Sequence, residues 1–353
     1  MTRLDARVRW LRSGGLALCL LLVSILRPGL AFAAAEWGAI QIAHETIEPG
    51  RVKKFTFLGV RSFEGSFIDF VVFAARGKTP GPTLCVTSAI HGDEVNSVEI
   101  ARRSFASVDV SKLKGTLIVL PAINSMGFRT ANRYLPDRRD LNRFFPGDRT
   151  GSVAAILAHA VFAGVIQKCT HLIDLHTGSN LRTNMPQIRV DRTNSVADAL
   201  AQNFGVGVII DGAGPDGSLR REAMKAGIPA IIYEAGPPLI FVEREIEEGV
   251  RGVRNVMIHL GMLESREQRE RSKMIARSSW LRVPIGEGGI YLPVVKLGDR
   301  VKPGQLLATV TDPVTDIAHR IEAEEAGIVI GMALPQIVLS GYGILHIGEF
   351  ASP

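Results

Sequence analysis

Three clusters of polar side chains in this 353-residue chain combine residue types that bind a divalent metal. His91 and Glu94 follow the apolar run TLCVTSAI, Asp174 and His176 end the run THLIDLH, and Glu234 ends the run PAIIYE. Zinc binds imidazole nitrogen and carboxylate oxygen, and a catalytic zinc site uses three protein ligands and a water. His91, Glu94 and His176 are therefore candidate ligands, although a His and a Glu three residues apart more often belong to a solvated helix start.

The spacing of Asp174 and His176 suits a supporting role for the carboxylate. Side chains alternate along an extended strand, so residues two apart lie on the same face. An imidazole that binds a metal usually donates its other ring N–H to a carboxylate, which orients the ring. Asp174 is thus predicted to hold His176. Asp93, between the first two candidate ligands, is more typical of a charge at a helix N-terminus than of a ligand.

The segment SMGFRTANRYLPDRRDLNRFFPG, residues 125–147, concentrates five arginines in a stretch that does not read as a helix. A guanidinium binds a carboxylate through two parallel hydrogen bonds, so this segment beside a metal cleft favours a substrate with a free carboxylate. A solvated loop and a phosphate or nucleic-acid contact are the alternatives. The net charge argues against nucleic acid, because residues 36–353 carry 36 basic and 34 acidic side chains with no basic cluster on one face.

Alternating strands and helices must position these clusters. Apolar runs at 83–90, 115–124, 170–178, 206–212 and 229–236 are typical of strands buried on both faces, and helical patterns occupy 96–108, 152–169 and 243–262. This alternation predicts an α/β sandwich around a mixed, largely parallel sheet. In such sheets ligands bind at the carboxyl ends of the strands, which is where all three clusters lie.

The two ends of the chain differ from this pattern. A charged stretch at 264–279 predicts a linker, and residues 280–353 contain short apolar runs with Gly and Pro turns, which predict a small all-β domain. This C-terminal segment resembles the barrel-sandwich hybrid of lipoyl and biotinyl carriers. Such carriers present a modified lysine on a hairpin, but the matching residues 311–327 contain no lysine. A carrier role is therefore not expected.

Residues 1–34 have the pattern of a secretory signal peptide: arginines, then GGLALCLLLVSIL, then Ala31-Phe32-Ala33. This pattern predicts an exported, periplasmic protein with no stable membrane span after cleavage, and the alternative is an uncleaved anchor. Cys85 and Cys169 lie in apolar runs, so buried free thiols are the expectation, although an oxidising compartment would let them pair.

The motifs HGDE, DLNRFFPG, DLHTG and YEAG, in this order, resemble those of the succinylglutamate desuccinylase/aspartoacylase family, a branch of the zinc carboxypeptidase superfamily. The resemblance covers roughly residues 50–350. It implies a zinc-carboxypeptidase-like three-layer sandwich at 36–263, followed by the C-terminal β domain that relatives place at the mouth of the active site.

The resemblance also implies a role for individual residues. One zinc ion would be bound by His91, Glu94 and His176. Asn142 and Arg143 resemble the clamp for the α-carboxylate of the substrate. Arg133 resembles the arginine that polarises the scissile carbonyl, with Arg129 as a weaker candidate, and Glu234 resembles the glutamate that serves as general base and acid.

These expectations favour a zinc-dependent hydrolase that deacylates an N-acylated amino acid with a free carboxylate. One alternative is a metallocarboxypeptidase that acts on short or cell-wall peptides. Another class of function is an exported protein that binds metal or carboxylate without turnover, and a third is an adaptor in an envelope assembly. The expected partners are small molecules and not nucleic acid, and the sequence leaves the oligomeric state open.

Overall fold

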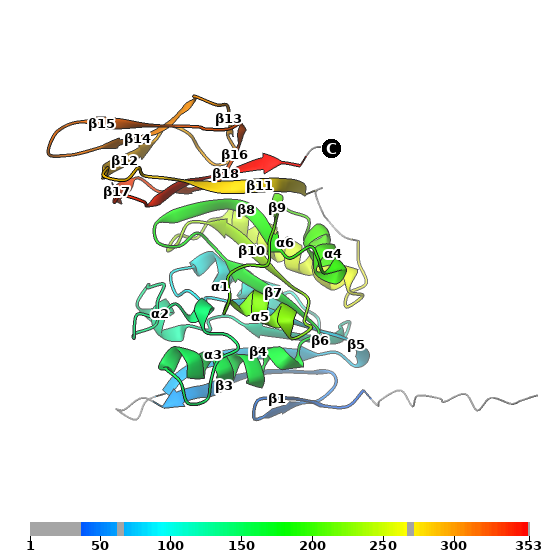
Figure 1. Cartoon of the computed structure of the whole chain (residues 1–353). Coiled ribbons are helices and arrows are strands. Elements are labelled where there is room, and N and C mark those ends of the chain that lie inside the picture. The colour runs from blue at the N-terminus through cyan, green and yellow to red at the C-terminus, as the bar shows by residue number, and fades with distance from the viewer. Residues whose placement is uncertain (1–36, 62–66, 267–271, 352–353) are drawn as a thin grey trace, which may run out of the picture. The chain divides into compact units, whose positions relative to one another are not determined.

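The computed structural model contains a twelve-stranded mixed sheet, whose strands come from both ends of the described chain (Figure 1). The structure describes residues 37–61, 67–266 and 272–351, so the predicted signal peptide lies outside the described residues. In spatial order the strands are β13 (Arg300–Val301), β16 (Gly327–Ala333), β18 (Gly343–Phe350), β11 (Lys273–Arg282), β9 (Val208–Asp211), β8 (Arg182–Val190), β10 (Ala230–Gly236), β7 (His171–His176), β5 (Thr79–Ser88), β6 (Lys114–Leu120), β4 (Phe67–Arg76) and β3 (Arg51–Arg61).

The centre of the sheet is parallel, as the continuous apolar runs predict. Strands β6, β5, β7 and β10 run in the same direction, whereas β8 runs antiparallel to β10 and parallel to β9. Every residue of β7 after His171 is buried, because both faces of the strand are covered. The carboxyl ends of β5, β7 and β10 consequently meet at one edge of the sheet.

Helices pack on both faces of this sheet and bury a separate apolar core on each. One core joins the sheet to α1 (Val95–Ala106), α4 (Ser195–Phe204) and α6 (Glu243–His259). The other joins it to α3 (Val153–Gly164) and α5 (Leu219–Lys225). Strand β5 contributes to both cores because its side chains alternate: Leu84 and Val86 belong to the first, and Cys85 to the second.

Several short elements lie between residues 40 and 168. Strands β1 (Ile40–Ile42) and β2 (Glu45–Ile47) form a two-stranded sheet. The arginine-rich segment is mostly irregular, with only α2 (Ser125–Arg129) and the 3₁₀ turn η1 (Leu141–Arg143), and a second 3₁₀ turn, η2 (Ile166–Lys168), follows α3. Within the described ranges no helix combines the length and the apolar character needed to cross a membrane.

The two cysteines form a disulfide, so the expectation of free thiols is wrong. Cys85 on β5 and Cys169, just before β7, have Cα atoms 5.8 Å apart and are joined across 84 positions of sequence. Both lie in the apolar core between the sheet and α3. The bond ties together the two strands that lead to His91 and His176.

Among the described residues after 272, strands joined by turns and loops are the only regular elements. Strands β15 (Ala318–Glu322), β14 (Leu306–Thr311), β12 (Gly289–Pro293) and β17 (Gln336–Val338) form a separate four-stranded sheet over their own apolar core. The linker predicted at 264–279 differs from the structure from Lys273 onward. There the chain enters β11, which pairs with β9 on one side and β18 on the other and so continues the main sheet.

Candidate active site

The ends of two neighbouring strands bring the predicted metal ligands together. His91 and Glu94 lie in the turn between β5 and α1, and His176 is the last residue of β7. All three side chains are buried: His91 is 4% exposed, Glu94 1% and His176 4%. The turn requires Gly92, because a Cβ at that position would lie 2.0 Å from the carbonyl carbon of Gly127 in α2.

The two imidazoles converge on the Glu94 carboxylate. Nδ1 of His91 lies 2.7 Å from Oε1, and Nδ1 of His176 lies 2.8 Å from Oε2. One ligand atom from each residue falls within 4.8 Å of the others, so the cluster could hold a metal ion. Burial raises the pKa of Glu94, but the neighbouring His91 and His176 outweigh it and hold the pKa well below its usual range. The carboxylate is therefore anionic and available as a ligand.

Each imidazole has a carboxylate on its other side. Nε2 of His176 lies 2.9 Å from Asp174, as the strand alternation predicts, and Thr87 donates a 2.8 Å hydrogen bond to the second oxygen of Asp174. Nε2 of His91 lies 3.1 Å from Asp140, which sequence reasoning did not single out. Both rings therefore present Nδ1 toward the metal position, since Nε2 is held from behind. Asp140 is the first residue of the DLNR motif, two positions before the candidate residue Asn142. This position in the motif could have identified Asp140 from the sequence.

Asp93 does not act as the predicted charge at a helix N-terminus. Helix α1 begins at Val95 with no acidic residue in its first turn. The Asp93 carboxylate instead accepts a 2.8 Å hydrogen bond from the Ser179 hydroxyl and a 3.5 Å one from the Asn180 backbone N–H. It thereby holds the loop that follows β7.

Arg133 lies beside the metal cluster, whereas Arg129 is exposed at the end of α2. Arg133 donates a 2.8 Å hydrogen bond to Asp140, and its Nη1 lies 3.7 Å from Oε1 of Glu94. Burial lowers the pKa of Arg133, but Glu94 and Asp140 raise it above its ordinary value, so the guanidinium stays charged.

Asn142 and Arg143 line the same cavity. The Asn142 side-chain oxygen accepts a 2.8 Å hydrogen bond from the backbone N–H of Leu219, which ties η1 to the start of α5. Arg143 donates to the Asn142 carbonyl at 2.7 Å, and no carboxylate pairs with it among the residues the structure describes. The side-chain NH₂ of Asn142 and the rest of the Arg143 guanidinium remain as donors toward the cavity.

Glu234, two residues before the end of β10, also lines this cavity. Asn184 donates a 2.6 Å hydrogen bond to its Oε2, Arg189 donates to the same oxygen at 3.1 Å, and Nε of Arg189 lies 3.1 Å from Oε1. Both partners belong to β8, which runs antiparallel beside β10. Sequence reasoning did not identify them, because RTNMPQIRV lacks the apolar pattern of the other strands.

The cavity has a volume of about 370 Å³. Trp280 of β11 lines it. Arg182 donates to the Gly343 carbonyl at 3.0 Å, and the Tyr342 hydroxyl donates to the Asn180 carbonyl at 2.8 Å. The C-terminal strands therefore contribute one wall of the cavity and contact the loop after β7.

Comparisons with known proteins identify the family and the fold of this chain. Residues 80–260 match the model for the succinylglutamate desuccinylase/aspartoacylase catalytic domain. An N-alpha-acetyl-L-2,4-diaminobutyric acid deacetylase from Halomonas elongata is 25% identical over 298 residues, which cover 81% of this chain and 86% of the relative. The product-bound structure of an ectoine utilization protein from Ruegeria pomeroyi covers 88% of this chain and 99% of its own, with 23% identity and a TM-score of 0.78.

A succinylglutamate desuccinylase from Silicibacter shares the fold as well, with a TM-score of 0.77 and 22% identity over 88% of this chain and 99% of its own. These structures support the α/β architecture, while the catalytic-domain match spans half of the chain and all four sequence motifs. The chain belongs to the succinylglutamate desuccinylase/aspartoacylase family.

Proposed function

We propose that this chain is an exported, zinc-dependent hydrolase that removes the acyl group from an N-acylated amino acid with a free α-carboxylate. The observation that carries the proposal is the shared cavity. It brings the His91, Glu94 and His176 cluster, the carboxylate of Glu234 and the guanidinium of Arg143 to one cavity. A metal site, a proton acceptor and an anchor for an anion are the parts that amide hydrolysis requires.

The donor set fits zinc. His91 and His176 offer imidazole nitrogens, Glu94 offers a carboxylate oxygen, and Asp140 and Asp174 orient the two rings. When bound, a zinc ion would supply a fixed positive charge that polarises an amide carbonyl and makes water acidic near neutral pH. Three protein ligands are the number typical of a catalytic zinc site.

Glu234 moves the proton in this proposal. Its carboxylate accepts a proton from the attacking water and returns it to the nitrogen of the leaving amine. Asn184 and Arg189 hold the carboxylate at the edge of the cavity, so its position does not depend on the substrate. Arg133, charged and beside the metal cluster, stabilises the negative charge that develops on the amide oxygen.

Asn142 and Arg143 anchor the substrate. The Asn142 side-chain oxygen is committed to Leu219, which leaves its NH₂ group to face the cavity as a donor. A carboxylate accepts hydrogen bonds only, so this NH₂ group and the Arg143 guanidinium complement it. A volume of about 370 Å³ suits a small molecule more than an extended peptide. The deacetylase relative from Halomonas elongata supports deacylation over carboxypeptidase activity.

Export is part of the proposal. The signal-like pattern at 1–34 and the disulfide between Cys85 and Cys169 both suit a compartment such as the periplasm, where disulfides persist. Fractionation of cells that express the full chain with a C-terminal tag measures this directly. Recovery of the uncleaved chain in the cytoplasm would contradict export.

The test of the activity is Glu234→Gln in the zinc-loaded protein, assayed on a panel of N-acetyl amino acids and dipeptides. We expect unchanged zinc content by atomic absorption and a fall in kcat of at least about a hundredfold, because the amide cannot accept the proton. Glu247→Gln, on the exposed face of α6, is the matched control. Near-normal turnover in Glu234→Gln would contradict its role, and turnover of dipeptides alone would favour the carboxypeptidase alternative.

A further inference from the structure

Two buried polar side chains in the sheet beside Glu234 have atoms without a hydrogen-bond partner among the described residues. Asn184 on β8 is 4% exposed, and His346 on β18 is 5% exposed. Oδ1 of Asn184 and Nδ1 of His346 are buried, and neither atom forms a hydrogen bond with the described part of the chain. A buried polar atom without a partner costs free energy, so each of these two atoms points to a partner nearby.

Strand pairing places the two side chains in one row of the main sheet. Gly331 of β16 pairs with Asn184 of β8 on one side and with His346 of β18 on the other. Residues directly opposite each other on neighbouring strands project from the same face of a sheet. Because the middle residue has no side chain, Asn184 and His346 approach each other over it. A Cβ on Gly331 would lie 2.7 Å from Oδ1 of Asn184 and 3.3 Å from the Cβ of His346.

The next residue in the row fixes the ring of His346. Trp280 of β11 pairs with His346, and the two rings stack with their centroids 4.8 Å apart and their planes 9° apart. Burial and the positive charge of Arg189 lower the pKa of His346 to about 3, so the imidazole is neutral at neutral pH. A neutral imidazole carries one N–H, on either Nδ1 or Nε2, and the other nitrogen is an acceptor.

The Asn184 amide has a donor side and an acceptor side. Its NH₂ group donates to Oε2 of Glu234 at 2.6 Å, so its oxygen is turned the other way, toward Gly331 and His346. An amide oxygen only accepts hydrogen bonds, and an imidazole Nδ1 that carries the proton only donates. A buried water connects such groups when it has at least two polar partners. The oxygen of Asn184 and Nδ1 of His346 are two such partners.

We propose that His346 is a positioning residue that acts on Glu234 through Asn184. Its Nδ1–H donates to one water above Gly331, and this water donates to the Asn184 oxygen. The amide then cannot turn round, so its NH₂ group stays on the Glu234 carboxylate. The proposal rests on the proposed function, because it concerns the proton that Glu234 accepts and returns. A turned amide would accept a hydrogen bond from protonated Glu234 and hold back the proton that the leaving amine needs.

His346→Phe and His346→Asn form the test pair. Phenylalanine keeps a ring for Trp280 to stack on but has no donor, whereas asparagine places an N–H close to the position of Nδ1. In the zinc-loaded protein, we expect His346→Phe to lower kcat by about five- to tenfold at unchanged KM, as the loss of a single hydrogen bond predicts. His346→Asn should recover most of this loss. An equal fall in kcat in both variants would overturn the proposal.

His319→Phe is the matched control, because His319 lies on β15 in the separate four-stranded sheet and does not line the cavity. It should leave kcat and KM unchanged. Thermal unfolding and zinc content of each variant verify that the fold and the metal site persist.

A double-mutant cycle with Asn184→Ala tests whether His346 acts through Asn184. Once the amide is removed, there is no group left for His346 to orient. We therefore expect His346→Phe to cause no further fall in kcat when Asn184→Ala is present, so the two losses do not add. Losses that add fully would overturn the connection between the two residues.

Nitrogen NMR on protein with isotope-labelled histidine separates this inference from the proposed function, because it needs no turnover. We expect the proton of His346 on Nδ1, with His346→Asn used to assign the signal, and Asn184→Ala should shift it. If these results hold while no N-acyl compound is hydrolysed, the proposed function fails and the contact between His346 and Asn184 stands. A proton on Nε2, or a signal that ignores Asn184→Ala, would overturn the contact even in an active enzyme.

Discussion

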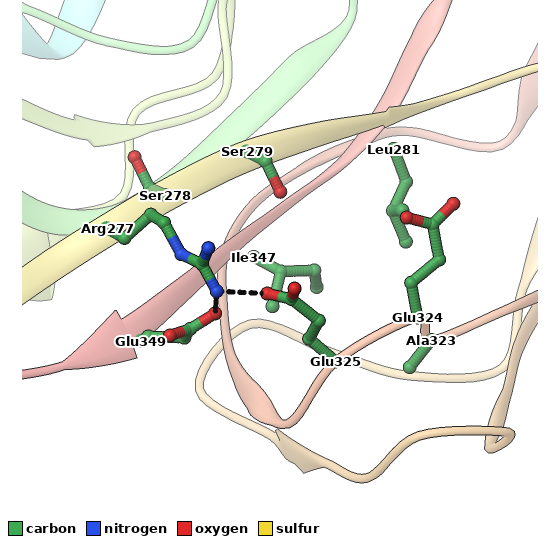
Figure 2. Close-up of a pocket in the computed structure, with 9 residues that line it drawn as sticks. All are labelled: Arg277, Ser278, Ser279, Leu281, Ala323, Glu324, Glu325, Ile347 and Glu349. Atoms are coloured by element: carbon green, nitrogen blue, oxygen red, sulfur yellow. Dashed lines mark hydrogen bonds and ion pairs between the residues drawn. The ribbon is translucent and has the colours of Figure 1, made fainter.

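Two concave regions of this molecule contain arginines paired with carboxylates, yet they differ in almost every other respect. The first is the active-site cavity at the ends of β5, β7 and β10. The second is a cavity of about 180 Å³ on the C-terminal part, where Figure 2 shows Arg277 of β11 with its guanidinium between Glu325 and Glu349. In the first, the Arg133 and Asp140 side chains are 15% and 18% exposed; in the second, those of Arg277 and Glu325 are 65% and 59% exposed.

The difference in exposure indicates which of the two cavities is suited to a metal site. Exposed ion pairs are screened by water and contribute about 0–1 kcal/mol, so their geometry is easily exchanged. Buried charges must keep their partners, and the active-site cavity arranges them in connected sets: His91 between Glu94 and Asp140, and His176 between Glu94 and Asp174. Fixed, buried, mutually oriented groups are what a metal site needs.

Glu94→Gln should have the largest effect of any single change in either region. The amide is a poor metal ligand and leaves two buried imidazoles without their shared anion, so we expect loss of bound zinc and of all measurable turnover. Metal analysis after dialysis measures the first and the N-acyl amino acid assay the second. Glu325→Gln removes the corresponding carboxylate from the exposed region and should leave both unchanged. Retention of stoichiometric zinc by Glu94→Gln would contradict the assignment.

Asp174→Asn should have an intermediate effect. The Asp174 carboxylate is not a predicted metal ligand but forms a hydrogen bond with Nε2 of His176. Without the carboxylate, the His176 ring can adopt another tautomer or orientation. We expect zinc affinity to fall by about ten- to a hundredfold, measured by competition with a chelator, with partial activity at saturating zinc. The exposed Asp216→Asn serves as the comparison. An unchanged zinc affinity would contradict the role of Asp174 in orienting the ring.

Arg277→Ala should have the smallest effect. We expect a change in unfolding free energy within about 0.5 kcal/mol and no change in turnover, because Glu325 and Glu349 regain water when the guanidinium is removed. Denaturation in urea, repeated at high salt, measures this. A loss of unfolding free energy well above 1 kcal/mol would contradict the distinction between the buried and the exposed ion pairs.

The sequence predicts those strands and helices whose pattern of apolar and polar residues matches their burial in the structure. Strands β5, β7 and β10 are apolar because both faces are covered, and their polar residues stand out at the ends. Strand β8 was not predicted, since one side of it contributes Asn184 and Arg189 to the cavity and Pro186 interrupts the run. Asn184 and Arg189 contact Glu234, which lies on a different strand. The sequence of β8 alone does not predict this contact.

The same reason explains what the site prediction missed. His91, Glu94, His176 and Glu234 follow buried strands, so topology alone brings them to one edge. Arg220 lies in an ordinary helical segment, and only the structure shows that its side chain is buried and lines the cavity. The disulfide is similar, because 84 residues separate two cysteines that the parallel pairing of β5 and β7 brings together.

The pairing of β8 has a consequence for how the protein folds. Residues 182–184 of β8 pair with residues 331–333 of β16, so Asn184, which holds Glu234, receives a neighbour about 150 positions later in the chain. Closing so long a loop is slow, and contacts of this range form late in folding. During synthesis, His91, Glu94 and His176 can therefore come together before β16 pairs beside Asn184 and Glu234. We expect turnover to appear only after the C-terminal strands have paired.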